Sequence, residues 1–527
     1  MLVATGVPGS LAPGFSPWIK PVLIRIAALL ASFLSIQTFT ALFLSALLLS
    51  TWFLATPILA ASTTPPPTTA PVATTALPDA ISRVARASRI PQDDFSLWVQ
   101  PIGSSKPLVG HNVDTPRNPA STMKLVTTFA ALTDLGPTYT WKTRIHVPGG
   151  IASGGTVKDV WIRGGGDPYL VLEEYWKMLS ALRDKGVRRI DGDLVIDTSA
   201  FALAPEDPGA FDGQPDRVYN LAPHPLLVNF NSVRFVVSAQ ADGKVGTAAF
   251  PALPNLSLIN RLKPSPGRCV GYQYGVAFDL QDPTHRNKAQ FDGTFPLKCW
   301  QFEFARTALT PEAYAHGLFE LYWQALGGES RGRMRTGVLP SQSKRALVEH
   351  TSRSLGEIIR LVNKFSNNVM TRHVELALGA ERFGLPATID KGHRAITEVL
   401  NESGIKTEGL VIANSAGLSR DSRISARQLA KILDVAWKSP FMPEYISSLA
   451  LVGMDGTMRS RLNGTSGAGR MHVKTGRLDH VSAIAGYVDA KSGQRLLVVL
   501  LLNTRNAHLG PGNLLQNAVL TWVHDQH

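Results

Sequence analysis

The 527-residue chain has little cysteine and lacks the short motifs that mark metal sites. Only two cysteines occur, Cys269 and Cys299, and no His-Glu-x-x-His pattern is present. Metal-dependent hydrolases and zinc modules need clusters of such ligands, so we expect no metal and no cofactor. Neither cysteine adjoins a candidate catalytic residue, which argues against a cysteine nucleophile.

Charge is also sparse, and it is unbalanced. Charged residues make up 18% of the chain, and the formal net charge is +13. Because the sequence has no Lys/Arg-rich run and no nucleic-acid recognition motif, we expect no nucleic-acid partner. Peptidoglycan and anionic lipid headgroups are better matched to a basic surface, although such a surface could simply aid solubility. An apolar content of 44% is ordinary for a core-forming protein, and the length predicts more than one domain.

The N-terminal segment predicts export to the periplasm or another extracytoplasmic compartment. Lys20 and Arg25 precede an apolar run over residues 26–60, which ends in small residues suited to cleavage. About 20 apolar residues suffice to span a bilayer, so residues 1–61 are either a cleaved signal peptide or a membrane anchor; a start codon assigned too early is the third explanation. Residues 62–80 then form a Thr/Pro-rich linker.

Export makes a disulfide the expected state of the two cysteines. An even count in an oxidising compartment favours pairing, so we predict a Cys269–Cys299 bridge. In the chain-entropy model it would contribute roughly 3 kcal/mol of stability. The alternative is a pair of buried thiols.

Ser121 and Lys124 are the candidate nucleophile and base. They open residues 121–133, whose apolar residues recur with a helical period and form a stripe. A spacing of three places both side chains on one helix face, roughly 5–6 Å apart at Cβ. A lysine withdrawn from water loses its proton more easily and can deprotonate the serine. Taken alone, Ser121 is better explained as a helix N-cap.

Two later triplets complete a three-part pattern. Ser366-Asn367-Asn368 lies in a helix-like context, and Lys474-Thr475-Gly476 leads into a strand-forming segment. Further matches at residues 341–344, 403–406 and 491–493 fall in polar or turn-like stretches and are decoys. Ser-x-x-Lys, Ser-x-Asn and Lys-Thr-Gly in this order are typical of serine acyltransferases that attack D-Ala-D-Ala peptides and β-lactams.

With these motifs, the chain resembles the class C low-molecular-mass penicillin-binding proteins, the D-alanyl-D-alanine carboxypeptidase/endopeptidases. The resemblance covers about residues 81–527. Two departures stand out: Asn414 replaces a frequent Asp, and Arg477 follows Lys-Thr-Gly where Ser or Thr is common. The motif contexts that also match are residues 163–168 (RGGGDP), 191–194 (DGDL), 363–365 (NKF), 414–420 (NSAGLSR) and 455–458 (DGTM).

Motif positions and the resemblance predict an α/β (α+β) fold of the serine β-lactamase/transpeptidase type. An antiparallel sheet between helical layers would be built from residues 81–147 and 346–527, with a mainly β insertion over residues 148–345. We expect core strands around residues 96–101, 107–111, 471–475, 483–488 and 496–502, a last helix over 511–524, and short insertion strands at 157–163, 193–196 and 233–239.

The resemblance also implies residue roles. Ser121 would attack the carbonyl between two D-alanines, and Lys124 would be the general base. Ser366 would relay a proton between Lys124, Lys474 and the leaving amine. Asn368 would hydrogen-bond the substrate amide. Peptidoglycan peptides would be the substrates and β-lactam antibiotics covalent inhibitors.

The third motif would hold the substrate tail. Lys474 and Thr475 would bind its carboxylate, and Gly476 would let it lie against the strand. The backbone N–H groups of Ser121 and Arg477 would form the oxyanion hole, and the Arg477 side chain would alter the grip on the tail.

Two further candidates have plain alternatives. Arg420 matches the family's Gly-Leu-Ser-Arg element and would approach the substrate, unless it is a solvated surface arginine. Asp216 would meet the ammonium group of a diaminopimelate side chain, unless it is an ordinary loop aspartate.

Other functions remain as alternatives. A β-lactamase would share the acylation step, but the long insertion and the lack of a deacylating Glu loop argue against it. A non-enzymatic wall-binding protein would not need to retain Ser121, Lys124, Ser366 and Lys474 together. Carboxypeptidase and endopeptidase action use the same groups, so we expect both.

Overall fold

The computed structural model describes residues 76–526, except 282–285 and 344. The expected signal or anchor and most of the linker lie outside the described residues. Within the described part, no helix is long and apolar enough to cross a membrane. Val72–His527 form one compact unit. Its hydrophobic cores are built from residues between Leu77 and Val523, so the unit carries complete cores of its own.

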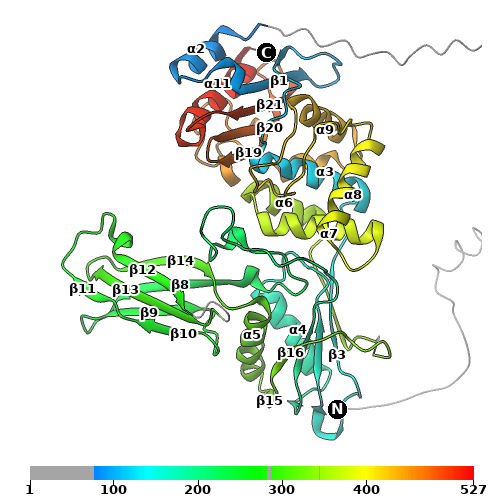
Figure 1. Ribbon diagram of the computed structural model, residues 1–527, viewed down its shortest axis with the longest axis vertical. Helices are drawn as coiled ribbons and strands as arrows, with labels where there is room; N and C mark the ends of the chain where they lie inside the picture. Colours follow the sequence, from blue (N-terminus) through cyan, green and yellow to red (C-terminus); the bar gives the residue numbers. More distant parts are fainter. Residues whose placement is uncertain (1–75, 282–285, 344, 527) are drawn as a thin grey trace, which may run out of the picture. The chain divides into compact units, whose positions relative to one another are not determined.

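A six-stranded antiparallel sheet joins the two ends of the described chain. Its order is β18-β19-β20-β21-β1-β2. The first strand pairs with the last one from Phe95↔Leu502 to Pro101↔Leu496, and the two lie side by side in Figure 1. The strands are β1 (Phe95–Pro101), β2 (Val109–His111), β18 (Ala450–Leu451), β19 (Met471–Leu478), β20 (Val481–Asp489) and β21 (Arg495–Asn503).

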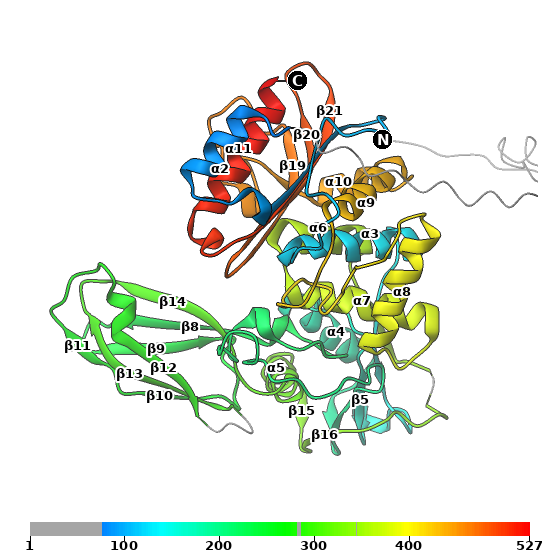
Figure 2. The same ribbon diagram turned by 45° about the horizontal axis from the view of Figure 1, so that its top comes forward.

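Helices cover both faces of this sheet, as expected. Successive residues of a strand point to opposite faces, and Leu497 and Leu500 of β21 accordingly enter different cores. Figure 2 shows α2 and α11 on one side of the sheet and the remaining core helices on the other. The helices on the two sides together are α2 (Asp79–Ala87), α3 (Met123–Leu135), α6 (Leu355–Phe365), α7 (Asn368–Phe383), α8 (Ile389–Glu402), α9 (Ala426–Lys438), α10 (Met442–Ser448) and α11 (Pro511–Gln526).

Helix α3 is more deeply enclosed than its sequence pattern predicted. We expected an apolar stripe, yet every residue over 123–132 is buried. The reason is tertiary, because α3 packs against α6, α7, α8 and α9. The stripe was therefore only one part of a helix that is enclosed on all sides.

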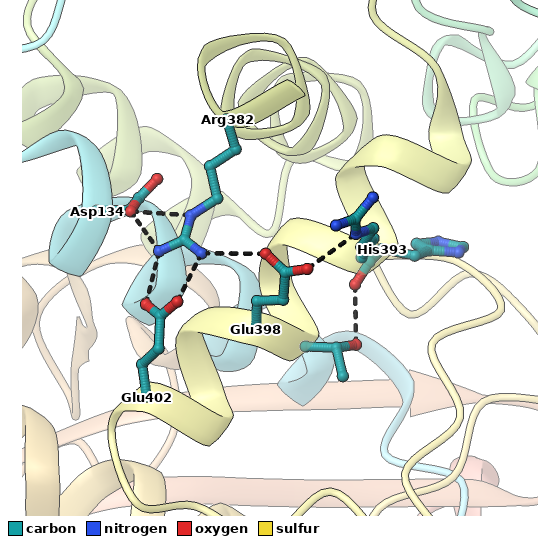
Figure 3. Close-up of polar contacts among 7 residues, drawn as sticks. Asp134, Arg382, His393, Glu398 and Glu402 are labelled. Carbon is teal, nitrogen blue, oxygen red and sulfur yellow. Dashed lines mark hydrogen bonds and ion pairs between the residues drawn. The ribbon is translucent and has the colours of Figure 1, made fainter. Parts of the chain in front are cut away.

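An arginine of α7 fixes the far end of α3 (Figure 3). Arg382 donates to Asp134 at the end of α3 over 2.7 Å, and to Glu402 of α8 over 2.7 Å. Glu398 of α8 lies 3.4 Å from the same guanidinium. These hydrogen bonds to carboxylates raise the pKa of Arg382 above its ordinary value. One permanently charged side chain thereby links α3, α7 and α8 at the end of α3 that lies opposite the nucleophile.

The insertion contains a five-stranded sheet of order β16-β7-β5-β3-β17. Its strands β3 (Lys142–His146) and β17 (Val348–Thr351) pair with each other, so the sheet extends to both sides of the expected insertion, residues 148–345. This pairing joins segments far apart in sequence, which no local pattern reveals. The other strands and their short neighbours are β4 (Thr156–Val157), β5 (Val160–Arg163), β6 (Arg189–Ile190), β7 (Leu194–Asp197), β15 (Glu329–Ser330) and β16 (Met334–Thr336).

Two details of the insertion differ from our prediction. Residues 157–163 are divided between β4 and β5, which belong to different sheets. The mainly β region also holds two helices, α4 (Leu172–Asp184) and α5 (Pro311–Ala325). Helix α5 had a recognisable start, because Thr310 caps it and Pro311 occupies its first turn.

The rest of the insertion is a small β part with an aromatic core. Phe235, Phe278, Phe291 and Phe304 pack with ring centroids 4.9–6.3 Å apart. Cys269 and Cys299 are disulfide-bonded at one end, with Cα atoms 5.3 Å apart. Its strands are β8 (Ser232–Ala239), β9 (Val245–Phe250), β10 (Ser257–Asn260), β11 (Lys263–Ser265), β12 (Val276–Gln281), β13 (Lys288–Pro296) and β14 (Gln301–Thr307).

Candidate active site

Ser121 and Lys124 meet at the start of α3. Ser121 lies in a single 3-10 turn, Ala120–Thr122, that leads directly into the helix. The Lys124 ammonium Nζ lies 3.1 Å from Ser121 Oγ. The predicted spacing of three therefore brings the candidate base within hydrogen-bonding reach of the candidate nucleophile.

Lys124 is buried among acceptors that carry no charge. Besides Ser121, its Nζ donates to Asn368 Oδ1 over 2.7 Å and to the Ala416 carbonyl over 2.6 Å. No carboxylate compensates its charge within the described residues that contact it. Burial, and then the nearby charge of Lys474, lower the pKa of Lys124 well below that of free lysine. A lysine in this state can accept the Ser121 proton.

Ser366 and Lys474 form a second pair. Ser366 ends α6 in a left-handed conformation, with φ 58°, instead of lying within a helix. Lys474, on β19, donates to Ser366 Oγ over 2.9 Å. Burial lowers the pKa of Lys474 to about 7. The turn between α6 and α7 thus aims the Ser366 hydroxyl at a lysine that can exchange a proton near neutral pH.

Asn368 links the pair on α3 to the insertion. Its Oδ1 accepts the Lys124 hydrogen bond, while its Nδ2 donates to the Tyr219 carbonyl over 3.2 Å. Among the described residues, no hydrogen bond joins Lys124 directly to Ser366. The expected relay through Ser366 therefore reaches Lys474 in this structure, whereas Asn368 takes the place beside Lys124.

Thr475 and Arg477 lie on β19 next to Lys474. Thr475 donates from Oγ1 to Thr457 Oγ1 over 2.8 Å. Arg477 is exposed, and no ion-pair partner for it occurs in the described part of the chain. Because side chains alternate along a strand, Thr475 and Arg477 point to the same side. This side carries a hydroxyl and a free guanidinium.

Position 476 must be glycine for a structural reason that our interpretation missed. A Cβ at this position would lie 2.5 Å from the Pro119 carbonyl oxygen and 3.0 Å from the Ser121 nitrogen. Glycine is thus required because β19 passes directly against the turn that holds the nucleophile. Room for substrate beside the strand is at most a second reason.

Two family-like contexts act as supports for the motifs. Lys364, two residues before Ser366, forms an ion pair with Asp455 over 2.6 Å. Asp455 in turn accepts from the Leu451 nitrogen over 2.7 Å and begins the turn that presents Thr457 to Thr475. These two family-like contexts therefore correspond to contacts that connect α6 with β19.

The segment that supplies the Ala416 carbonyl is held by a buried acid. Ser415 donates to Glu375 of α7 over 2.6 Å, and Glu375 is 1% exposed. Thr127 of α3 donates to the Ser415 carbonyl over 2.8 Å. Glu375 had no motif to mark it, and only the tertiary structure brings it behind Lys124.

Arg420 and Asp216 have their charges taken up by other residues. Arg420 pairs with Asp479 over 3.2 Å and lies 5.0 Å from the Phe211 ring centroid. Asp216 pairs with Arg306 over 2.8 Å. Among the described residues neither contacts a motif side chain, and the roles expected of both stay predictions.

The insertion nevertheless reaches the site through two residues that the sequence did not indicate. Phe211 packs against the small apolar cluster of Ala120, Leu478 and Val481, which adjoins the nucleophile. Tyr219 provides the carbonyl that Asn368 binds, and burial together with its hydrogen bond to Asp212 raises the pKa of the Tyr219 hydroxyl to about 12. In the described part of the chain, no cluster of three or more His, Cys, Asp or Glu residues could hold a metal ion.

The chain is similar to known D-alanyl-D-alanine carboxypeptidases. A D-alanyl-D-alanine carboxypeptidase of Actinomadura sp. (strain R39) is 30% identical over 419 residues, which cover 76% of each chain. The carboxypeptidase DacB of Haemophilus influenzae is 23% identical over 406 residues, covering 76% of this chain and 84% of its own.

A solved structure shares the fold. Penicillin binding protein 4 (dacB) of Haemophilus influenzae superposes with a TM-score of 0.72 at 21% identity, over 84% of this chain and 99% of its own. The profile of one peptidase family matches residues 77–519, which include all three motifs. The chain therefore belongs to the D-Ala-D-Ala carboxypeptidase 3 (S13) family.

Proposed function

We propose that the protein is a serine-type D-Ala-D-Ala carboxypeptidase that also cleaves D,D-crosslinks in peptidoglycan and is acylated by β-lactams. The observation that carries this proposal is the buried Lys124 Nζ, 3.1 Å from Ser121 Oγ, with its pKa lowered. A neutral amine at this distance is what the first chemical step needs.

Acylation begins when Ser121 Oγ attacks the carbonyl carbon between two D-alanines and passes its proton to Lys124. The backbone N–H groups of Ser121 and Arg477 stabilise the oxyanion. Collapse of the intermediate breaks the peptide bond, and the leaving amine takes a proton from the Ser366 hydroxyl. Lys474, whose Nζ lies 2.9 Å from Ser366 Oγ, then gives Ser366 a new proton. Water then attacks the acyl-enzyme and passes a proton through Ser366 to Lys474. The ester bond to Ser121 breaks, Ser121 Oγ recovers its proton from Lys124, and the shortened peptide is released.

The substrate tail binds along β19. Thr475 donates a hydroxyl to its carboxylate, and the Arg477 guanidinium adds a two-pronged contact, which strengthens carboxylate binding. Lys474 contributes positive charge from the opposite side of the strand. Asn368 exchanges its bond to the Tyr219 carbonyl for one to the substrate amide, so substrate binding displaces part of the insertion loop.

The compartment and the domain division also belong to this proposal. Peptidoglycan lies outside the cytoplasm, so the protein acts there after export by residues 1–61. We divide the described chain into a peptidase domain over 76–141 and 352–526 and an insertion between them, bounded by the β3–β17 pair.

The test is incubation of residues 62–527 with muropeptides that contain uncrosslinked pentapeptides and crosslinked dimers, followed by mass spectrometry. Pentapeptides should lose one alanine and dimers should fall to monomers, both blocked by penicillin and absent in Ser121→Ala. Unchanged peptides together with rapid penicillin turnover would identify a β-lactamase. Unchanged peptides without a penicillin adduct would identify a wall-binding protein.

A further inference from the structure

The small β part of the insertion carries the most exposed large hydrophobic side chains of the described chain. Val270 is 91% exposed, Tyr274 88% and Trp300 81%. An aromatic side chain has about 150–250 Å² of surface, so these three residues present an apolar patch on the order of 400 Å². Patches of that size on a folded protein commonly mark a contact surface.

Covalent and local geometry hold these residues together. Val270 and Trp300 each directly follow one cysteine of the Cys269–Cys299 disulfide, whose Cα atoms are 5.3 Å apart. The Tyr274 ring folds back over Gly271, where an added Cβ would lie 3.5 Å from it. We call these three residues, with Lys263, Arg268 and Lys298 around them, the tip patch.

Charge around the tip patch has one sign. Residues 263–275 and 293–301 contain Lys263, Arg268 and Lys298 but no Asp or Glu. All three cations are exposed, and the described residues offer none of them an ion-pair partner. The neighbouring hairpin is neutral in sum, because Asp242 pairs with Lys244 over 3.1 Å.

The geometry points to a lipid surface: we propose that the tip patch binds anionic phospholipid bilayers. Trp and Tyr prefer the membrane–water interface, and unpaired Lys and Arg are attracted to anionic headgroups. The almost fully exposed Val270 extends from a loop end, where an aliphatic group can enter the acyl boundary. A sugar-binding platform would be expected to add carboxylates around its rings, and neither loop has one.

Binding through the tip patch is reversible, because one small apolar patch with a few charges gives only marginal anchoring. Each cation contributes about fivefold to binding at low ionic strength, so the three together contribute on the order of 100-fold. The site at Ser121 shares no residue with the tip patch, so penicillin labelling reports folding independently of lipid binding.

The test uses residues 72–527, the compact unit with its own complete cores, so that the apolar run over 26–60 cannot contribute. Sedimentation is measured with phosphatidylcholine vesicles with and without phosphatidylglycerol. The unit should bind only when phosphatidylglycerol is present, and high salt should weaken the binding. Vesicles with brominated acyl chains should quench its tryptophan fluorescence, a readout that needs no variant.

Two variants remove the patch. The first variant removes the two aromatic rings and combines Trp300→Ser with Tyr274→Ser. The second variant reverses the charge and combines Lys263→Glu, Arg268→Glu and Lys298→Glu. Each variant should lose sedimentation with the vesicles and keep penicillin labelling. The matched charge control is a third variant that combines Lys106→Glu, Lys158→Glu and Lys185→Glu. It should still bind the anionic vesicles.

Three results would overturn the proposal. Wild-type protein that ignores anionic vesicles would do so, as would equal losses in the patch variant and the charge control. Binding to penicillin-blocked peptidoglycan sacculi through the same residues, without vesicle binding, would assign the patch to the wall polymer instead.

Discussion

Replacing Gly476 by alanine tests whether the close approach of β19 to the nucleophile turn controls acylation. The added Cβ would lie 2.5 Å from the Pro119 carbonyl oxygen, 3.0 Å from the Ser121 nitrogen and 3.1 Å from Ala120 Cβ. Two of these atoms belong to the backbone, so no side chain can move aside. Strand and turn must separate by about 1 Å to restore ordinary contact distances.

Such a shift changes two quantities. Overpacking of this kind costs about 1–3 kcal/mol of unfolding free energy, which a compact unit of this size tolerates. The Ser121 and Arg477 N–H groups, however, would no longer converge on one oxyanion, and losing one such donor costs about 10²–10³ in rate. We therefore expect Gly476→Ala to remain folded at 25 °C and to be acylated by penicillin about 100 to 1,000 times more slowly.

The assay is the rate of labelling by a fluorescent penicillin, measured beside the thermal unfolding midpoint. Gly356→Ala is the matched control, because its Cβ would lie 3.5 Å or more from its neighbours, in the first turn of α6. Alanine there should leave the acylation rate unchanged and, as the better helix former, add up to about 1 kcal/mol of stability. Labelling of Gly476→Ala within twofold of wild type would refute the steric reasoning.

Two further predictions concern the lysines and the disulfide. The rate of acylation should rise with pH as Lys124 loses its proton, and it should fall above about pH 7 as Lys474 loses its own. Lys474→Met removes the nearby positive charge, which raises the pKa of Lys124, so the rising part of the pH profile should move to higher pH. A rising part that does not move would argue against this coupling. Replacing both Cys269 and Cys299 by Ser should lower the unfolding free energy of the insertion by about 3 kcal/mol in denaturant titrations, with penicillin labelling retained, and an unchanged midpoint would contradict this.

The sequence by itself determined the parts of the site that depend on local spacing. Ser121 and Lys124 are three residues apart at the start of a helix, so helical geometry alone brings their side chains together. The strand-forming runs near both ends of the chain likewise indicated five strands of the six-stranded sheet, although β18 was not predicted. The order of the three motifs indicated the family.

Our interpretation was less successful where a residue's role depends on a distant neighbour. Helix α4 and helix α5 were overlooked inside a region rich in Gly, Pro and short β runs, because their stability comes from the shared core of the insertion. The roles of Gly476 and Glu375 were likewise hidden, since each is defined by backbone or side chains that approach it only after folding.

Tertiary structure alone decided how the motifs are connected. Lys124 and Asn368 are 244 residues apart, and their hydrogen bond exists because α3 and α7 pack together. Packing of the turn Val218–Asn220 against α7 brings Tyr219 of the insertion to Asn368. Packing of β19 against the turn Ala120–Thr122 brings Gly476 against Ser121. Local spacing brings Lys124 to Ser121. Long-range packing brings Lys474 to Ser366 and Asn368 to Lys124, because those contacts follow from the path of the whole chain.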